Sequence, residues 1–220
     1  MLLDLLLPQR CVACARPGVQ LCDRCRDAIP RLRPPVCARC GSPVAWPVQR
    51  CRECSGRRLA FAAARAAVAY DDVVRPLVAA WKERGLRRFA LTAAELVAEE
   101  LPVPRAAGLT FVPPDPDRRL ERWHHPPEAL ARELGRRWEL PVLPLLRRTS
   151  AAPRQRGLDL ASRRRNVAGA FAAAPARGAL CLVDDVYTTG STVSAAASAL
   201  RKAGARRVEV VTFARAIRVR

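Results

Sequence analysis

Residues 180–192 read Leu-Cys-Leu-Val-Asp-Asp-Val-Tyr-Thr-Thr-Gly-Ser-Thr, and this stretch decides the fold class. The apolar run Ala179–Val183 has the pattern of a strand that is buried on both faces, as in parallel sheets. Two acids, a loop of small residues and a helical pattern over 192–203 follow it. A strand that leads through such a loop into a helix is typical of α/β proteins. We therefore expect a parallel sheet with right-handed crossovers.

The rest of the chain after residue 60 continues this alternation. Helices are predicted over 73–84, 89–101 and 128–138, and strands over 109–112 and 207–213. Residues 140–146 are predicted as an edge strand, because Pro141 and Pro144 bar a central position. The composition changes at about 57–60, so we predict a small domain over 1–58 and an α/β domain over 59–220.

Eight of the nine cysteines precede residue 55, in four Cys-x-x-Cys pairs. The pairs are Cys11/Cys14, Cys22/Cys25, Cys37/Cys40 and Cys51/Cys54. Each such turn points two thiolates at one centre, and two turns complete the tetrahedron that zinc prefers. The regular spacing favours two zinc ions over the alternatives, which are disulfides and iron–sulfur clusters. Four sulfur ligands leave no position for a catalytic water, so both ions are predicted to be structural.

Three further points concern the cysteines. Sequential pairing is the simplest arrangement, with the first four cysteines around one ion and the last four around the other; crossed pairing stays open. Gly41, directly after Cys40, is expected to let the backbone turn sharply under the metal. The ninth cysteine, Cys181, lies inside the buried strand and is expected in the core.

The chain is strongly basic, with 39 Lys and Arg against 20 Asp and Glu and a formal net charge of +19. Two zinc sites with four thiolates each would reduce this to about +15. Such an excess favours anionic partners, although biased codon usage and a plain basic surface are the alternative. No apolar run reaches the length of a membrane span, and residues 2–7 are too short and too acidic for a signal peptide. A cytoplasmic protein without membrane insertion is expected.

The loop after the two acids is suited to a phosphate. Its backbone N–H groups and the hydroxyls of Thr188, Thr189, Ser191 and Thr192 can turn onto one anion, beside the positive end of the following helix. No lysine follows Gly190, so this is not a Walker A loop. Carboxylates next to a phosphate suit a ribose 5-phosphate. An ordinary strand-to-helix turn is the alternative.

The stretch 180–192 resembles the phosphoribosyl pyrophosphate (PRPP) signature of type I phosphoribosyltransferases. The resemblance implies that Asp184 and Asp185 hold the ribose hydroxyls and act in catalysis, and that Mg²⁺ accompanies the pyrophosphate. The 5-phosphate would be held by Thr188, Thr189, Gly190, Ser191 and Thr192. Combined with the cysteines, nearly the whole chain resembles the ComF family of competence-associated proteins. This implies a type I phosphoribosyltransferase-like parallel sheet with helices on both faces, preceded by a small double zinc-ribbon domain.

Further residues match the ComF pattern, and one segment departs from it. The matching residues are Tyr70, Lys82, Gln155, Leu158, Arg163, Asn166, Ala170 and Phe171. Where relatives carry Arg-Gly-Phe-Asn-Gln, only Arg122 is retained before Trp123, His124, His125 and Pro126. Thr188 stands where purine-salvage relatives have an acidic base, so no general base is named. We expect both histidines to be inert surface residues, Trp123 to be a half-buried anchor or a base-stacking residue, and Trp81 and Trp138 to lie in the core.

A basic segment over 147–165 precedes the strand of the phosphate loop. Its seven arginines are Arg147, Arg148, Arg154, Arg156, Arg163, Arg164 and Arg165, and its only acid is Asp159. Guanidinium groups bind phosphates in bidentate fashion, so the segment is predicted to bind the pyrophosphate of PRPP or single-stranded DNA. A solvated surface loop is the alternative.

Three hypotheses follow for the function. The first is a ComF-like protein that binds PRPP and single-stranded DNA, with other DNA-uptake proteins as partners in natural transformation. The second is an active phosphoribosyltransferase that transfers ribose 5-phosphate from PRPP to a nucleobase or an amine. The third is a non-catalytic zinc-ribbon adaptor.

Overall fold

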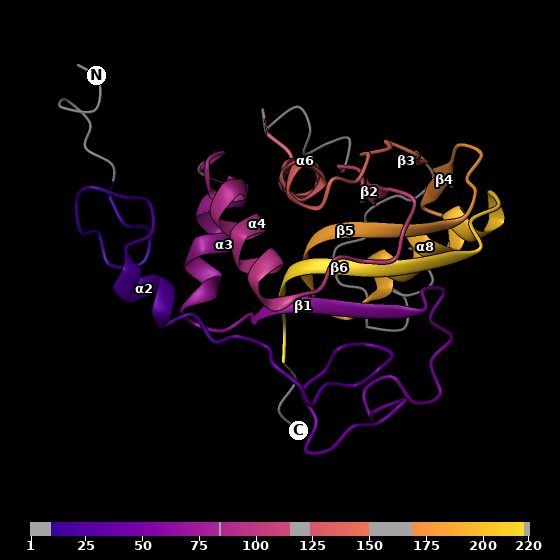
Figure 1. Cartoon of the computed structure of the whole chain (residues 1–220), viewed down its shortest axis with the longest axis horizontal. Coiled ribbons are helices and arrows are strands. Elements are labelled where there is room, and N and C mark those ends of the chain that lie inside the picture. Colours follow the sequence, from indigo (N-terminus) through magenta and orange to yellow (C-terminus); the bar gives the residue numbers. More distant parts are fainter. Residues whose placement is uncertain (1–9, 84, 115–123, 150–168, 218–220) are drawn as a thin grey trace, which may run out of the picture.

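A computed structural model describes residues 10–83, 85–114, 124–149 and 169–217. Its centre is a four-stranded sheet in the order β1-β6-β5-β2, in which every pairing is parallel. The strands are β1 (Ala63–Ala69), β2 (Leu109–Phe111), β5 (Ala179–Tyr187) and β6 (Arg207–Arg215), drawn in Figure 1. The parallel α/β sheet predicted from residues 180–192 is therefore confirmed.

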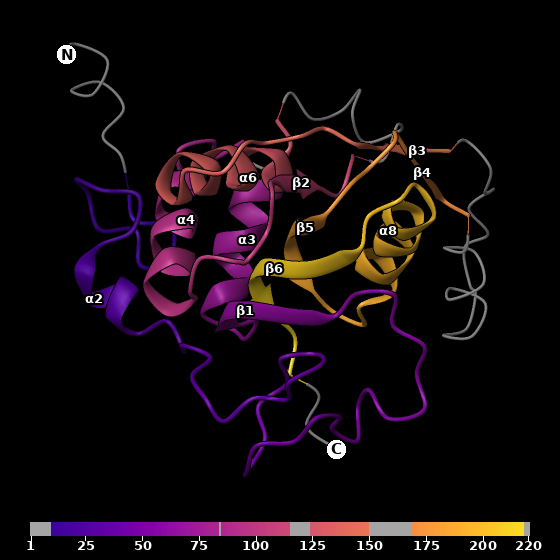
Figure 2. The ribbon, with the colours of Figure 1, turned by 45° about the vertical axis from the view of Figure 1, so that its right-hand side comes forward.

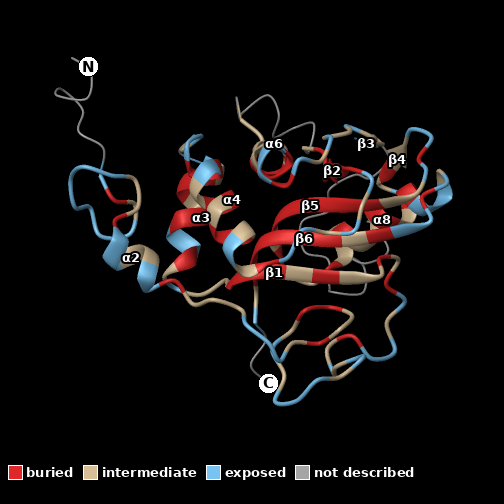
Figure 3. Cartoon of the chain, viewed as in Figure 1, coloured by how far each residue is buried: buried red, intermediate tan, exposed pale blue. Residues whose placement is uncertain are grey.

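Helices cover both faces of this sheet. One face carries α3 (Val74–Glu83), α4 (Phe89–Glu100) and α6 (Pro126–Trp138). The other carries α8 (Ser191–Lys202) and the antiparallel pair β3 (Leu146–Arg148) and β4 (Phe171–Ala173). Figure 2 shows the two layers from the side, and Figure 3 shows the buried residues concentrated along the strands between them.

The side chains of the central strands divide between the two cores by the period-two alternation of a strand. Cys181 and Val183 of β5 lie in the core with α3, α4 and α6, whereas Leu180 and Leu182 lie in the core with α8. Cys181 is fully buried, as expected. Both faces of β5 are thus dry, which is why its sequence is a continuous apolar run.

The cysteine-rich segment packs against the α/β domain in two places. The first half, which contains α2 (Asp23–Asp27), lies beside α3 and α4, and Arg26 pairs with Glu95 and Glu99 of α4. The second half lies beneath β1, and Cys37, Cys40 and Cys54 share a core with α8. The second half is therefore part of the packing of the α/β domain.

Several strands differ from the sequence predictions. Strand β1 was not predicted, because its sequence Ala-Ala-Arg-Ala-Ala-Val-Ala has weak strand propensity and is held by its pairing with β6. Of the residues 140–146, which were predicted as an edge strand, only Leu146 belongs to a strand, namely β3. Pro141 and Pro144 have no backbone N–H and therefore interrupt the hydrogen bonds between strands. Val142 nevertheless makes one parallel bridge with Leu109, so this segment does border the sheet. Strand β5 runs on to Tyr187, which places both acids inside it.

Candidate functional site

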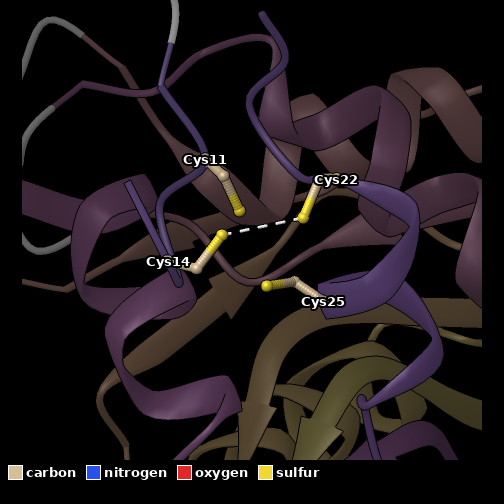
Figure 4. A group of neighbouring side chains, drawn as sticks. All are labelled: Cys11, Cys14, Cys22 and Cys25. Atoms are coloured by element: carbon tan, nitrogen blue, oxygen red, sulfur yellow. Dashed lines mark hydrogen bonds between the residues drawn. The ribbon is translucent and has the colours of Figure 1, made fainter. Parts of the chain in front are cut away.

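The eight paired cysteines form two clusters in sequential order. One contains Cys11, Cys14, Cys22 and Cys25, shown in Figure 4, and the other contains Cys37, Cys40, Cys51 and Cys54. Within each cluster all four sulfur atoms lie within 4.8 Å of one another. The sequential pairing is confirmed, and the crossed alternative is excluded.

The geometry of both clusters fits zinc. Four sulfurs at Zn–S distances of about 2.3 Å stand about 3.8 Å apart on the edges of a tetrahedron. The Cys14–Cys22 and Cys37–Cys54 sulfur pairs are each 3.7 Å apart, and the Cys40–Cys51 pair is 3.5 Å apart. The double zinc ribbon thus supplies two four-cysteine sites for structural Zn²⁺. Gly41, with φ of +71°, turns the chain beneath the second site, where a Cβ would meet the Ala64 carbonyl oxygen at 2.5 Å.

We expect purified protein to carry two zinc ions per chain, because each cluster offers a complete set of ligands. Elemental analysis of protein purified without added metal measures this ratio directly. A ratio near one would contradict the second site, and iron in place of zinc would contradict the assignment of the metal.

The two acids and the loop 188–190 lie at a topological switch point of the sheet. β5 leads into α8 on one face, whereas its neighbour β2 precedes α6 on the opposite face. At such a point the loops at the carboxyl ends of the two strands diverge and leave a crevice, where α/β proteins bind their ligands. Asp184, Asp185 and the loop 188–190 stand at the carboxyl end of β5.

The two carboxylates have different surroundings. Asp185 pairs with Lys82 of α3, with 2.7 Å between Nζ and Oδ1, and Asp184 accepts a hydrogen bond from the Asp185 backbone N–H at 3.0 Å. Each acid is only 8% exposed. Burial raises the pKa of Asp184 from 3.8 to about 8, and the charge of Asp185 adds to the increase, whereas Lys82 opposes it. Asp184 is therefore protonated near neutral pH, and Asp185 is the carboxylate with a cationic partner.

This raised pKa predicts a pH effect on stability. In the unfolded chain Asp184 loses its proton near pH 3.8, whereas the folded chain holds it to about pH 8. Between these values the folded state binds the extra proton, so the free energy of unfolding falls as the pH rises. Relative to Asp184→Asn, we expect the wild type to lose stability between about pH 4 and about pH 8, by up to about 1.4 kcal/mol per unit. Urea unfolding of both proteins tests this, and parallel pH curves would contradict it.

The loop after the acids has a defined backbone. The Thr189 hydroxyl donates to Ser191 Oγ at 2.9 Å and accepts from the Ser191 backbone N–H at 3.2 Å. Gly190, with φ of +73°, stands directly before α8. A Cβ at this glycine would lie 2.2 Å from the Tyr187 hydroxyl oxygen, so the loop rests directly on the Tyr187 ring. The left-handed conformation of Gly190 lets the chain turn from the loop directly into α8.

Two arginines connect this loop to the second zinc cluster. The Arg57 guanidinium donates to the Thr189 carbonyl at 2.6 Å. Arg215, only 1% exposed, lies with its guanidinium carbon 4.3 Å from the centre of the Tyr187 ring. The same guanidinium donates to the Cys40 carbonyl at 2.6 Å and pairs with Glu53 at 2.7 Å. The support beneath the phosphate loop therefore includes a zinc ligand.

The basic segment is described only in part. Arg147 is exposed, whereas Arg148 donates to the Pro113 carbonyl at 3.2 Å and lies 4.9 Å from the centre of the Phe171 ring. Arg148 thus joins the β3–β4 pair to the loop after β2. The five arginines from 154 to 165, and Gln155, Leu158 and Asn166, lie outside the described residues.

The histidines differ from expectation. Both are partly buried: His124 Nε2 stands 3.1 Å from the Trp81 carbonyl oxygen, and His125 packs 5.9 Å from the Phe111 ring. Burial lowers the pKa of His125 to about 4, so it is neutral near pH 7. The expectation of surface histidines was wrong, because they precede α6 and fix its start to the core. Trp81 and Trp138 are buried as predicted, and Trp123 lies outside the described residues.

Sequence reasoning missed the roles of Arg57 and Arg215. Arg57 was noted only as a domain boundary, and Arg215 lies beyond the predicted end of the last strand. An arginine in a basic chain gives no sign of burial, so no sequence signal identified either one. Lys82 was noted by family resemblance, and the structure brings it to Asp185.

The fold and the sites define a class of protein: a double zinc ribbon joined to an α/β domain consistent with the phosphoribosyltransferase fold. Residues 2–55 match the family described as the double zinc ribbon domain. A stretch of 105 residues is 34% identical to Competence protein F of Haemophilus influenzae, covering 45% of this chain and 46% of that protein. The two matches together support assignment of the chain to the ComF family. The chain matches about half the length of this curated relative.

None of the helices in the described part of the chain is both long and apolar enough to cross a membrane.

Proposed function

We propose that this chain binds PRPP with Mg²⁺ at residues 184–192 and acts in competence, with single-stranded DNA as a second ligand. The observation that carries the PRPP proposal is the buried pair Asp184 and Asp185 at the carboxyl end of β5, directly before a loop with a left-handed glycine. The competence role is supported by the similarity to Competence protein F. A cytoplasmic location and contacts with other DNA-uptake proteins belong to the same proposal.

Each residue of the proposed site has a distinct part. The 5-phosphate accepts hydrogen bonds from the backbone and hydroxyl groups of residues 188–192, at the positive end of α8. Asp185 accepts hydrogen bonds from the ribose hydroxyls, and Lys82 pairs with the same carboxylate. Protonated Asp184 donates to the same sugar. Mg²⁺ neutralises charge on the pyrophosphate when it is bound.

Asp185→Asn is expected to weaken the binding of PRPP by about 1–3 kcal/mol, the scale of a lost charged hydrogen bond. Isothermal titration with PRPP and Mg²⁺ measures the change. Asp72→Asn is a matched control, because Asp72 is exposed and pairs with Arg75 on the surface. Unchanged affinity in Asp185→Asn would refute PRPP binding at this site. ATP should bind more weakly than PRPP, since the loop has no Walker lysine.

Single-stranded DNA is the proposed second ligand because of the net charge of +19 and the arginines of 147–165. Contacts to phosphates carry no sequence information, so binding is expected to be independent of base sequence. Its affinity should fall with salt at a slope of about −0.7 per neutralised phosphate.

Catalysis is a second candidate, favoured by the contact between Lys82 and a carboxylate in the crevice. In that reaction the bond from ribose C1 to pyrophosphate breaks and a bond from C1 to an acceptor nitrogen forms. The nitrogen loses its proton to solvent, and the carboxylates stabilise the positive charge at C1. Release of pyrophosphate in the presence of a panel of nucleobases and amines distinguishes this enzyme from a protein that only binds PRPP. If the protein neither turned over nor bound PRPP, the third hypothesis, a non-catalytic zinc-ribbon adaptor, would be favoured.

A further inference from the structure

A continuous groove runs along α8, between this helix and the segment 56–62 that leaves the second zinc ribbon. It consists of two adjoining cavities of about 750 Å³ and about 610 Å³. Both cavities are lined by Leu59, Ala60, Ser198 and Lys202, so they lie side by side along the helix. From Ser191 to Lys202 the helix alone spans about 16 Å at 1.5 Å per residue.

The groove is lined by positive charge along its length. At the far end of α8, Arg201, Lys202, Arg206 and Arg207 line it, and Arg39 lines it from the ribbon side. Arg57 and Arg58 line it near the start of α8. Among the described residues that line the groove, none is acidic. Seven cationic side chains around one concave surface attract a ligand with several negative charges.

The individual contacts show which of these charges are free for a ligand. Arg207 pairs with Glu209 at 2.9 Å, and Arg201 donates to the Ala205 carbonyl at 3.2 Å. Lys202 and Arg206 are exposed and have no salt bridge or side-chain hydrogen bond to any described residue. Arg39 donates from Nη2 to the Leu59 carbonyl at 2.6 Å. Lys202 and Arg206 can therefore bind an anion without first breaking a contact with any residue that the structure describes.

The rest of the lining consists mainly of small and apolar side chains. Ser191, Ser194 and Ser198 repeat at helical spacing on the groove side of α8, and Ser194 Oγ accepts a hydrogen bond from the Ala60 backbone N–H at 3.1 Å. This bond holds the two walls together. The two aromatic rings of the lining, Phe61 and Phe171, are 0% and 7% exposed, so they offer no face for a base to stack on. The groove can therefore bind phosphates but cannot distinguish one base from another.

We propose that this groove holds the sugar–phosphate backbone of single-stranded nucleic acid, an inference that rests on the proposed binding of single-stranded DNA. A flexible strand can place successive phosphates in a concave groove, whereas a duplex is a stiff rod with a convex surface. The basic end lies about 16 Å from Ser191 along α8, so a strand there and PRPP at the loop can bind together. Within the described residues, the proposed DNA-binding surface therefore lies along α8. It adds to the surface predicted for the arginines of 147–165.

The test compares two pairs of substitutions in the full-length protein that remove equal charge. Lys202→Ala with Arg206→Ala removes two groove cations, whereas Arg87→Ala with Arg88→Ala removes two exposed cations before α4, on the opposite face of the sheet. Fluorescent oligodeoxythymidylate is titrated into each protein at several salt concentrations. The salt slope should fall by about 1.4 in the groove pair, at about 0.7 per lost phosphate contact, and should stay unchanged in the control pair.

The possible outcomes separate this inference from the proposed function. If the wild type binds the oligonucleotide and the two pairs have equal slopes, the groove is excluded while DNA binding stands. If the wild type does not bind it, both the groove and the DNA part of the proposed function are overturned. PRPP affinity is measured on the same proteins and should be equal in all of them. If the groove pair lost PRPP binding, its substitutions would have displaced the loop 188–192. A change in DNA binding would then not come from a direct contact between the groove and the DNA, and the inference would be overturned.

Discussion

Replacing Cys37 by Ser is expected to destabilise the α/β domain, whereas replacing Cys14 by Ser is expected to affect mainly the first zinc ribbon. Both changes remove one ligand from a four-cysteine site and should lower the zinc ratio from two to one. The difference lies in what each ribbon supports. Cys37 is fully buried in the core that contains α8, whereas Cys14 is exposed.

The large effect at the second site comes from Arg215. This buried guanidinium has Glu53 and the Cys40 carbonyl as polar partners, and both belong to the second ribbon. Unfolding that ribbon leaves the charge buried without them, which costs about 3–5 kcal/mol. The first ribbon is tied to α4 by partly exposed pairs such as Arg26–Glu99, which are worth about 0–1 kcal/mol each.

Urea unfolding followed by far-ultraviolet circular dichroism reports on the α/β domain in both variants, because α3, α4, α6 and α8 all belong to that domain. Arg215→Met in the wild-type background is the control, because it removes the buried charge and keeps both zinc sites. In the Arg215→Met background, Cys37→Ser should lower the free energy of unfolding by less than it does in the wild type. Equal destabilisation by Cys14→Ser and Cys37→Ser would contradict the asymmetry between the ribbons.

The sequence predicted the parts of the site whose chemistry is local. The cysteine spacing predicted both metal clusters, because a Cys-x-x-Cys turn sets the distance between two ligands within four residues. The stretch 180–192 predicted the strand, the acids, the loop and the helix, because hydrophobic periodicity and a glycine determine each of them nearby in the chain.

The parts that the sequence did not predict depend on contacts between distant segments. Strand β1 has an alanine-rich sequence and exists through its register with β6. The link from Arg215 to Glu53 joins residues 162 positions apart, and the contact of Arg57 with Thr189 joins residues 132 positions apart. In a chain with 39 basic residues, neither arginine differs from its neighbours until the fold is known.

Together these contacts make the second zinc ribbon a structural support for the loop 188–190. Arg57 holds the Thr189 carbonyl from the ribbon side, and Arg215 lies under the Tyr187 ring on which Gly190 rests. The conformation of the loop therefore depends on contacts from both sides, and small changes in volume at Gly190 should have large effects on ligand binding.

Gly190→Ala is accordingly expected to weaken the binding of PRPP at least about 100-fold, or about 2.7 kcal/mol. The left-handed conformation, with φ of +73°, costs an alanine about 1–2 kcal/mol. The added Cβ would also lie 2.2 Å from the Tyr187 hydroxyl oxygen and 2.4 Å from the ring carbon that carries it, so the loop must move away from a ring fixed in the core. A displaced loop no longer directs its N–H groups at the phosphate.

Gly178→Ala is the matched control. Gly178 has nearly the same backbone conformation, with φ of +69°, but the nearest atom to an added Cβ is the Ala107 Cβ at an ordinary 3.9 Å. It stands at the opposite end of β5 from the loop, so this variant should lose a similar amount of stability and keep its affinity for PRPP. Titration of both variants with PRPP and Mg²⁺, together with urea unfolding, separates backbone strain from displacement of the loop. Equal affinities in the two variants would show that the contact between Gly190 and Tyr187 does not shape a phosphate site.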